Sequence, residues 1–170
     1  MIFVCTGTQV YQFDRLIKKL DELVENGVIK DRIFAQIGSS TYIPKNYEYK
    51  AFLSADEFKE YQDQANLIIS HGGTGALIGA SKKGKNIIAV PRLSEYGEHT
   101  DNHQLQIVEV LEREGYIRAV YNIEDLADVI ESANKEPITK IYSRPSNILE
   151  ILEDFIDKSV KEVKRREIGT

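Results

Sequence analysis

Three glycines lie within the four positions 72–75, one residue after the apolar run "NLIIS" at 66–70. Because glycine lacks a Cβ, the chain can turn sharply there and main-chain amides can come close to an anion. The next segment, about 74–83, has the pattern of a helix, whose amino end carries partial positive charge. These features are typical of a phosphate-binding turn, although the glycines could instead serve only to pack a helix tightly against a sheet. The residues of this turn are His71, Gly72, Gly73, Thr74 and Gly75.

A polar loop, "PRLSEYGEHTDNHQ" at 91–104, follows the next apolar run. We expect Asp101 to cap the helix after this loop, which places His103 and Gln104 in the first helical turn. Neutral hydrogen-bonding side chains at a helix start suit sugar hydroxyls. The candidate binding residues of this loop are Arg92, Glu98, His99, His103 and Gln104.

A second glycine turn follows the first apolar run of the chain, in "TGTQVYQFDRL" at 6–16. If both turns lie at one edge of a sheet, Gly7 and Thr8 can face the same ligand as the turn at 71–75. For His71 the alternative is a loop histidine whose hydrogen bonds are satisfied within the protein.

Short β-branched runs alternate with longer segments of helical period along the chain. This rhythm favours parallel strands joined by right-handed crossovers, so we predict a three-layer α/β sheet of Rossmann type. In such a sheet every strand ends at the same edge, and ligands bind in the crevice there. The predicted strands cover 1–6, 32–37, 47–52, 66–70, 86–90 and 116–120. The predicted helices cover about 13–24, 55–64, 74–83, 101–114 and 123–133.

Two other nucleotide motifs fit the sequence poorly. Residues 79–86, "GASKKGKN", lack the Ser or Thr that holds magnesium in a Walker A loop, and they end a helix instead of opening one. Residues 73–79, "GTGALIG", have the spacing GxGxxxG and follow a late strand, whereas a dinucleotide fingerprint is GxGxxG after the first strand. The Walker A motif is therefore rejected, and the second motif gives only weak support for dinucleotide binding.

Composition narrows the class of protein. An apolar share of 42% against 29% charged residues predicts a folded globular domain. The formal charge of −5 does not favour nucleic acid as a partner. The single cysteine, Cys5, is compatible with a reducing compartment, and no segment reaches the ~20 apolar residues that a membrane-spanning helix needs. We therefore expect a soluble chain in the cytoplasm.

The segment "SHGGTGALIGASKKGKNIIAVPRLSEYGEHTDNHQLQ" resembles the nucleotide-sugar signature of the glycosyltransferase family 28 C-terminal domain, the donor-binding half of GT-B enzymes such as MurG. The opening "TGTQVYQFDRLI" and the short chain are similar to the small catalytic subunits of split glycosyltransferases. These include exopolysaccharide and capsule subunits of the PssE and EpsE kind and the soluble subunit of the eukaryotic dolichol-linked N-acetylglucosaminyl transferase. The resemblance spans roughly residues 1 to 120.

The resemblance implies how the two glycine turns bind a ligand. The turn at 72–75 would hold the diphosphate of a UDP-sugar, with Gly7 and Thr8 flanking it across the crevice. Phe52 and Leu53 match the place where relatives hold uracil, although both could simply belong to the core.

The resemblance also implies a donor-sugar contact by His103 and Gln104. One position departs from the pattern, because Gly79 stands where MurG-like relatives have a glutamate that holds the ribose. Glu95 or Glu98 could take over that role from the neighbouring loop.

The function implied is that of the donor-binding catalytic subunit of a two-component inverting glycosyltransferase, which transfers a sugar from a UDP-sugar to a lipid-linked acceptor in exopolysaccharide or capsule synthesis. We expect a membrane-anchored partner that binds the acceptor, supplies the catalytic base and brings this chain to the inner face of the cell membrane. Neither a cofactor nor a metal is expected, because the histidines and acids lack the spacing of a structural metal site. Possible bases within the chain are Asp14, Glu98, His99 and His103.

Two other functions remain open: a non-catalytic nucleotide-sugar-binding enhancer of the partner, and an oxidoreductase that binds NAD(P).

We predict a nucleotide-sugar-binding domain over residues 1–143 and a C-terminal amphipathic helix over 144–170. The helix would pack on the domain itself or on the partner through one apolar face. That face comprises Ile148, Leu149, Leu152, Phe155, Ile156, Val160 and Val163.

Overall fold

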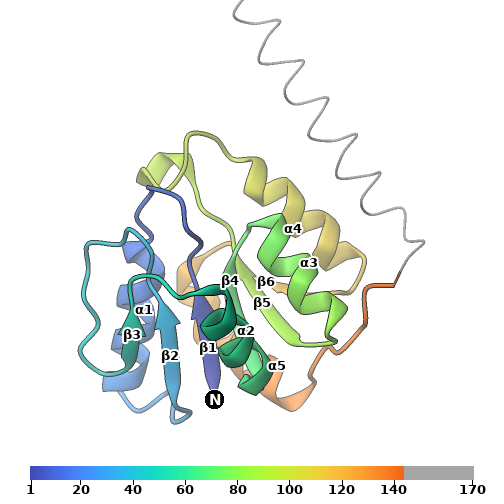
Figure 1. The fold of residues 1–170 in the computed structure, drawn as a ribbon, viewed down its shortest axis with the longest axis horizontal. Coiled ribbons are helices and arrows are strands. Elements are labelled where there is room, and N and C mark those ends of the chain that lie inside the picture. Colours follow the sequence, from blue (N-terminus) through green and yellow to red (C-terminus); the bar gives the residue numbers. More distant parts are fainter. Residues whose placement is uncertain (144–170) are drawn as a thin grey trace, which may run out of the picture.

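Parallel strands form the centre of the computed structural model, which describes residues 1–143 (Figure 1). They are β1 (Ile2–Cys5), β2 (Ile33–Gln36), β3 (Glu48–Lys50), β4 (Leu67–His71), β5 (Asn86–Val90) and β6 (Arg118–Ala119). The spatial order is β3-β2-β1-β4-β5-β6, and neighbouring strands in this order are parallel. The order reverses between β1 and β4, which makes that pair the switch point of a doubly wound sheet.

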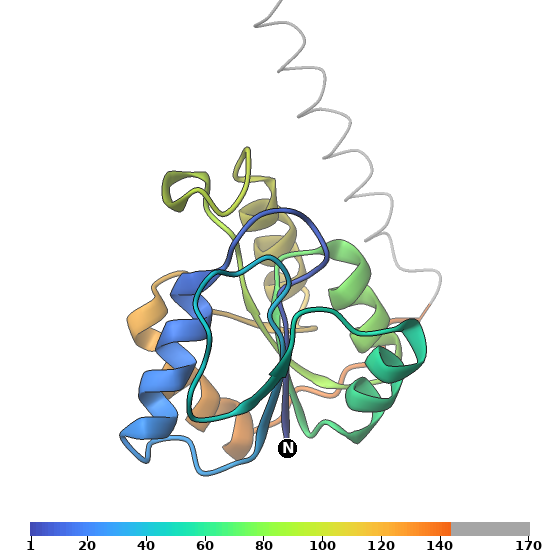
Figure 2. The same ribbon diagram turned by 60° about the vertical axis from the view of Figure 1, so that its left-hand side comes forward.

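Helices cover both faces of the sheet, as the view along it in Figure 2 shows. They are α1 (Asp14–Glu25), α2 (Ala55–Gln64), α3 (Thr74–Lys82), α4 (His103–Arg113) and α5 (Leu126–Lys135), with short 3₁₀ turns η1 (Ser94–Tyr96) and η2 (Ile123–Asp125). Helices α1 and α5 lie on one face, and α2, α3 and α4 lie on the other (Figure 2). The predicted three-layer α/β class is therefore confirmed.

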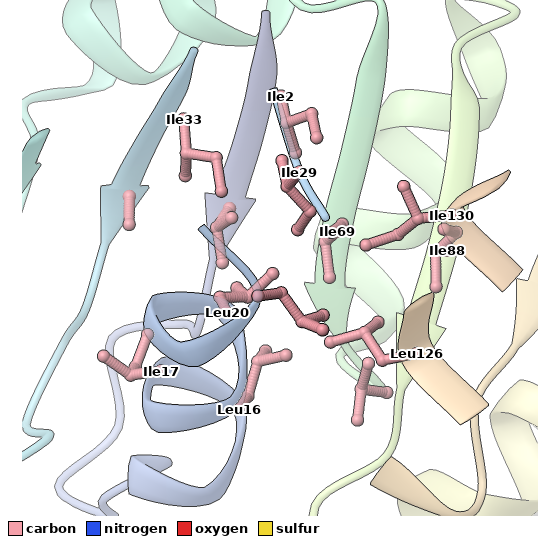
Figure 3. Packing of buried hydrophobic residues seen from close by; sticks show 14 of the residues in the cluster. Ile2, Leu16, Ile17, Leu20, Ile29, Ile33, Ile69, Ile88, Leu126 and Ile130 are labelled. Carbon is pink, nitrogen blue, oxygen red and sulfur yellow. The ribbon is translucent and has the colours of Figure 1, made fainter. Parts of the chain in front are cut away.

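Each face of the sheet has its own hydrophobic core. On the first face, Leu16, Ile17 and Leu20 of α1 belong to one buried cluster with Ile2 of β1 and Leu126 of α5 (Figure 3). On the second face, side chains of α2, α3 and α4 cover alternate strand residues such as Phe3 and Ile68. Successive strand residues point to opposite faces. The central strands are apolar throughout because both of those faces are covered.

The predicted element bounds agree best where local chemistry fixes them. Helix α2 spans 55–64 as predicted, because Ser54 begins it with a capping box: Ser54 Oγ accepts the Glu57 N–H at 3.3 Å, and the Glu57 carboxylate accepts the Ser54 N–H at 2.9 Å. Strand β5 also has its predicted bounds, 86–90.

Helix α4 begins at His103 rather than at 101, and its N-cap is Asn102. Asn102 Oδ1 accepts hydrogen bonds from the N–H and the hydroxyl of Ser94, so this side chain holds the preceding loop instead of the helix. Asp101 accepts the N–H of His103 at 3.0 Å from one position further upstream. The expectation that Asp101 is the N-cap was wrong by one residue.

The predicted C-terminal helix, 144–170, lies outside the described residues.

Candidate functional site

Two glycine turns lie side by side at the switch point of the sheet. Strands β1 and β4 pair in parallel with Cys5 beside Ser70, so the chain leaves both strands at the same edge. Gly7 follows β1 with a positive φ of 83°, and Gly72 follows β4. This edge, between neighbouring strands whose crossovers run to opposite sides, is where open α/β sheets bind ligands.

His71 fills the space between the two turns. Its Nδ1 lies 3.3 Å from the carbonyl oxygen of Cys5. A Cβ added at Gly7 would lie 2.6 Å from His71 Nε2, and one added at Gly73 would lie 2.3 Å from the same atom. Any side chain at either glycine would therefore displace the ring.

His71 is neutral near pH 7. Burial, followed by the charge of Arg92, lowers the pKa of His71 to about 4. A carbonyl oxygen can only accept, so the proton of the neutral ring resides on Nδ1, the atom facing Cys5. The lone pair of Nε2 then faces the two turns.

The amino end of α3 presents unpaired main-chain amides at the same edge. Its N-cap is Gly73, and no side chain in residues 1–143 caps it. The first helical bond runs from the Leu77 N–H to the Gly73 carbonyl at 3.1 Å, so the N–H groups of Thr74, Gly75 and Ala76 have no acceptor within the helix. An anion approaching this end would meet these donors and the helix dipole.

The glycines of this turn differ in their reasons for lacking a side chain. A Cβ at Gly72 would lie 2.7 Å from the Cβ of Gln104, so this glycine permits close packing against α4. A Cβ at Gly75 would meet nothing within 4 Å. The packing alternative therefore holds for Gly72, whereas packing does not explain Gly75.

Arg92, a candidate binding residue, is fully buried under the loop that follows β1. Its Nη2 donates to the carbonyl oxygens of Thr6 and Tyr11. Its main-chain N–H donates to Gln104 Oε1 at 3.1 Å. Within residues 1–143, Arg92 Nε and Nη1 have no hydrogen-bond partner. The guanidinium thus ties two rim loops together and places a positive charge beneath them.

Glu98 has a structural role, which corrects the expectation that it serves as a base or holds the ribose. Its side chain is fully buried, and both carboxylate oxygens accept from Arg15, each at 2.9 Å. It also accepts the N–H of Leu93 at 3.0 Å. A carboxylate engaged in this way is not free to take a proton from an acceptor.

Asp14, another candidate base, holds the loop after β2. Its carboxylate accepts from the main chain and hydroxyl of Thr41 and from the main chain of Tyr42. Burial acts to raise the pKa of Asp14, but these hydrogen bonds outweigh it and lower the pKa.

His103 and Gln104 lie in the first turn of α4, as predicted, but their surroundings differ. The side chain of His103 is 38% exposed, whereas Gln104 is buried with its amide oxygen on Arg92. His103 is therefore available to a ligand, and Gln104 supports the rim.

The structure also brings His99, Asp101 and His103 together, with one ligand atom from each lying within 4.8 Å of the others. Spacing along the chain did not predict this grouping, because the path of the loop brings alternate residues to one point.

Phe52 and Leu53 follow β3 at the same edge of the sheet. Phe52 is 51% exposed, so it does not belong to the core, while Leu53 packs partly against the second core. The side chain of Gln36 accepts the Leu53 N–H and donates to the Gly7 carbonyl, both at 3.3 Å. Sequence reasoning missed Gln36, although a lone amide in an otherwise apolar strand signals a polar partner. Thr8, the remaining candidate, is exposed.

Two surface hollows lie elsewhere on the described structure. One is lined by Val24 and residues 29–33 and 45–48, and the other by residues of 28–31 and 127–135. Both lie at the opposite edge, where β2 and β3 begin, and neither includes residues of the glycine turns.

Within residues 1–143, no helix has the length and apolar character needed to cross a bilayer.

Comparisons with known proteins agree with this geometry. The chain matches the Glycosyltransferase family 28 C-terminal domain over residues 1–159. It is 31% identical over 130 residues to the human UDP-N-acetylglucosamine transferase subunit ALG13. The match covers 68% of this chain and 10% of that protein. The mouse protein of the same name is 29% identical over 127 residues, with the same coverage. The chain thus spans about a tenth of the length of these curated relatives.

Solved structures show the same fold. A solution structure of ALG13 superposes with a TM-score of 0.53 at 19% sequence identity, covering 84% of this chain and 89% of that one. The crystal structure of MurG from Acinetobacter baumannii gives a TM-score of 0.57 at 17% identity, covering 91% of this chain and 49% of MurG. From the family match over most of its length, this chain belongs to the glycosyltransferase family 28 C-terminal domain family.

Proposed function

We propose that this chain is the donor-binding subunit of a two-component inverting glycosyltransferase, which transfers a sugar from a UDP-sugar to a lipid-linked acceptor in exopolysaccharide or capsule synthesis. The observation that carries the proposal is the pair of glycine turns at the switch point, beside the uncapped amino end of α3. The name of the human relative, a UDP-N-acetylglucosamine transferase subunit, supports the donor class.

The diphosphate of the donor would bind at the turn after β4. The free amides of Thr74, Gly75 and Ala76 can donate to its oxygens, and Gly75 leaves room for their approach. Glu98 pairs with Arg15, whereas the guanidinium of Arg92 forms no ion pair within residues 1–143 and places a positive charge beneath the rim. Both features favour an anion.

The same donors serve the chemistry. When an acceptor hydroxyl attacks the anomeric carbon, the bond from that carbon to the diphosphate breaks and UDP leaves with the bonding electrons. Preorganised amides stabilise the charge that develops on the leaving oxygen. The proton of the acceptor goes to a base.

Uracil and sugar would extend in opposite directions from the diphosphate. Phe52 offers an exposed aromatic ring next to Leu53 for the base. His103 offers a partly exposed imidazole for the sugar. Thr8 and Gly7 flank the diphosphate from the neighbouring turn.

A partner subunit would supply the base. Asp14 and Glu98 are both engaged in holding loops, which leaves His99 and His103 as the alternatives within this chain. We place the acceptor, the membrane anchor and the attachment to the inner face of the cell membrane on that partner. Residues 144–170, for which we keep the proposal of a helix, would pack on this domain or on the partner. Truncation after residue 143 tests this choice. If the shortened chain still binds UDP but no longer forms the complex, the helix packs on the partner.

Calorimetry with UDP, UDP-N-acetylglucosamine and NADPH tests the ligand class. We expect binding of both uridine nucleotides and none of NADPH, and the reverse result would contradict the proposal in favour of an oxidoreductase. Turnover of a lipid-diphosphate acceptor, with and without the partner, separates a catalytic subunit from an enhancer. If a UDP-site variant of this chain still supports full turnover by the partner, the chain is not the donor-binding subunit.

A further inference from the structure

Three potential metal ligands converge in the loop that leads into α4. His99, Asp101 and His103 alternate along the chain, and their ligand atoms lie within 4.8 Å of one another. The Nδ1 atoms of both imidazoles lie near the same carboxylate oxygen, Asp101 Oδ1. Two imidazoles and one carboxylate form a ligand set suited to divalent first-row transition metals.

The contacts of His99 leave lone pairs facing each other. The N–H of Asp101 lies 3.3 Å from His99 Nδ1 and can only donate, so Nδ1 must present a lone pair. Asp101 Oδ1 lies 3.3 Å from the same nitrogen and also presents lone pairs. Two acceptors at this distance repel each other, and a cation between them would convert the repulsion into attraction.

One ligand of the three is already held in place. The side chain of His99 is only 7% exposed. The centroid of its ring lies 5.2 Å from that of Tyr11 and 4.7 Å from that of His103, with the two imidazoles in an edge-to-face arrangement. Tyr11 belongs to the loop after β1, so the cluster lies beside the loop that carries the first glycine turn.

The other two ligands can adjust. The side chains of Asp101 and His103 are 59% and 38% exposed. Ligand atoms around a tetrahedral Zn²⁺ are about 3.4 Å apart, as bond lengths of about 2.1 Å require. His99 Nδ1 and Asp101 Oδ1, at 3.3 Å, already have this spacing. His103 Nδ1 lies closer than this to Asp101 Oδ1, so rotation of the His103 side chain away from the carboxylate would complete the site.

We propose that His99, Asp101 and His103 bind one divalent first-row transition cation, such as Zn²⁺, at the rim of the sheet. Three protein ligands leave at least one coordination position for water or for an oxygen of a ligand. The site goes beyond the proposed transferase function and is tested without any nucleotide.

The test is titration of Co²⁺ into the full chain, freed of metal and without a polyhistidine tag, followed by the visible d–d absorption. We expect saturation at one Co²⁺ per chain and displacement by Zn²⁺. Asp101→Asn keeps an oxygen that can accept the His103 N–H but loses the charge, and His103→Asn removes an imidazole at a partly exposed position. Each should weaken Co²⁺ binding by at least about 10-fold.

Glu109→Gln is the matched control, because Glu109 is an exposed carboxylate on the same helix. It should bind Co²⁺ as the wild type does, and circular dichroism should show that all variants are folded. Absence of a saturable spectrum, or equal binding by all variants, would overturn the proposal, the latter showing adventitious binding. Calorimetry with UDP in EDTA reports separately on the donor site, so either proposal can fail without the other.

Discussion

His71 occupies the space that a side chain at Gly73 would need, because a Cβ at that glycine would lie 2.3 Å from His71 Nε2. The same nitrogen blocks a side chain at Gly7 on the other turn, at 2.6 Å. One imidazole therefore sets the distance between the two turns at the switch point. Gly75, one residue beyond Thr74, is free of such contacts and is the better position for probing a ligand.

Replacing Gly75 by alanine should raise stability and weaken nucleotide binding. The added methyl meets no protein atom within 4 Å, and alanine in place of a helical glycine gains up to about 1 kcal/mol. At the rim the same methyl would obstruct the diphosphate, so we expect a Kd for UDP about 10-fold higher, equivalent to about 1.4 kcal/mol. Thermal unfolding and calorimetry measure the two effects.

Gly79→Ala is the matched control for helix propensity, since Gly79 lies in the same helix and also has open space around its Cβ position. Its gain in stability should be similar, because its Cβ position is equally open. Unchanged affinity in Gly75→Ala would show that no anion approaches that amide.

Acid should destabilise the protein through His71. Burial, and next the charge of Arg92, lower the pKa of His71 to about 4, whereas in the unfolded chain it is about 6.5. Between these values the unfolded state binds more protons, so the free energy of unfolding falls as pH decreases from about 6.5 towards 4. Urea unfolding across this range should give a steeper dependence for the wild type than for His71→Gln. An NMR titration of the ring that shows a pKa near 6.5 would refute this.

The buried pair of Arg15 and Glu98 should be important for stability. Glu98→Ala leaves the guanidinium without its partner, and we expect a loss of about 3 kcal/mol in the free energy of unfolding. Glu131→Ala removes a carboxylate from the exposed pair with Lys135 and should cost less than about 0.5 kcal/mol. Denaturant unfolding of both variants checks the contrast, and losses of similar size would contradict the burial of Glu98.

Substitutions of His103 and of Gln104 should have different effects on ligand binding, measured with any metal chelated. His103→Ala removes a partly exposed side chain from the sugar side, so UDP-N-acetylglucosamine should lose affinity while UDP changes little. Gln104→Ala removes the acceptor of the Arg92 N–H, next to Gly72, and should weaken both ligands. Equal losses for both ligands in His103→Ala would place that imidazole away from the sugar.

The fold was predictable because its signals are local. The run 86–90 is apolar almost throughout because both faces of β5 are covered, and such a run predicts a buried strand. Ser54 and Glu57, only three positions apart, mark the start of α2. The glycine turn after β4 was predictable for the same reason. A glycine cluster between a strand and a helix has few structural uses.

The roles of the polar side chains at the rim were not predictable in this way. Glu98 looked like a candidate base, but its partner Arg15 lies 83 residues away in sequence. The start of α4 was misplaced because Asn102 turns back to Ser94, and the His99–Asp101–His103 cluster depends on the path of the same loop.

By itself, therefore, the sequence determined the alternation of strands and helices, the parallel sheet and the two glycine turns, since periodicity and the missing Cβ act within a few residues. Only the tertiary structure decided which rim side chains are buried in ion pairs, which remain exposed, and how His71 joins the turns. Those outcomes depend on contacts between segments that the sheet brings together from distant parts of the chain.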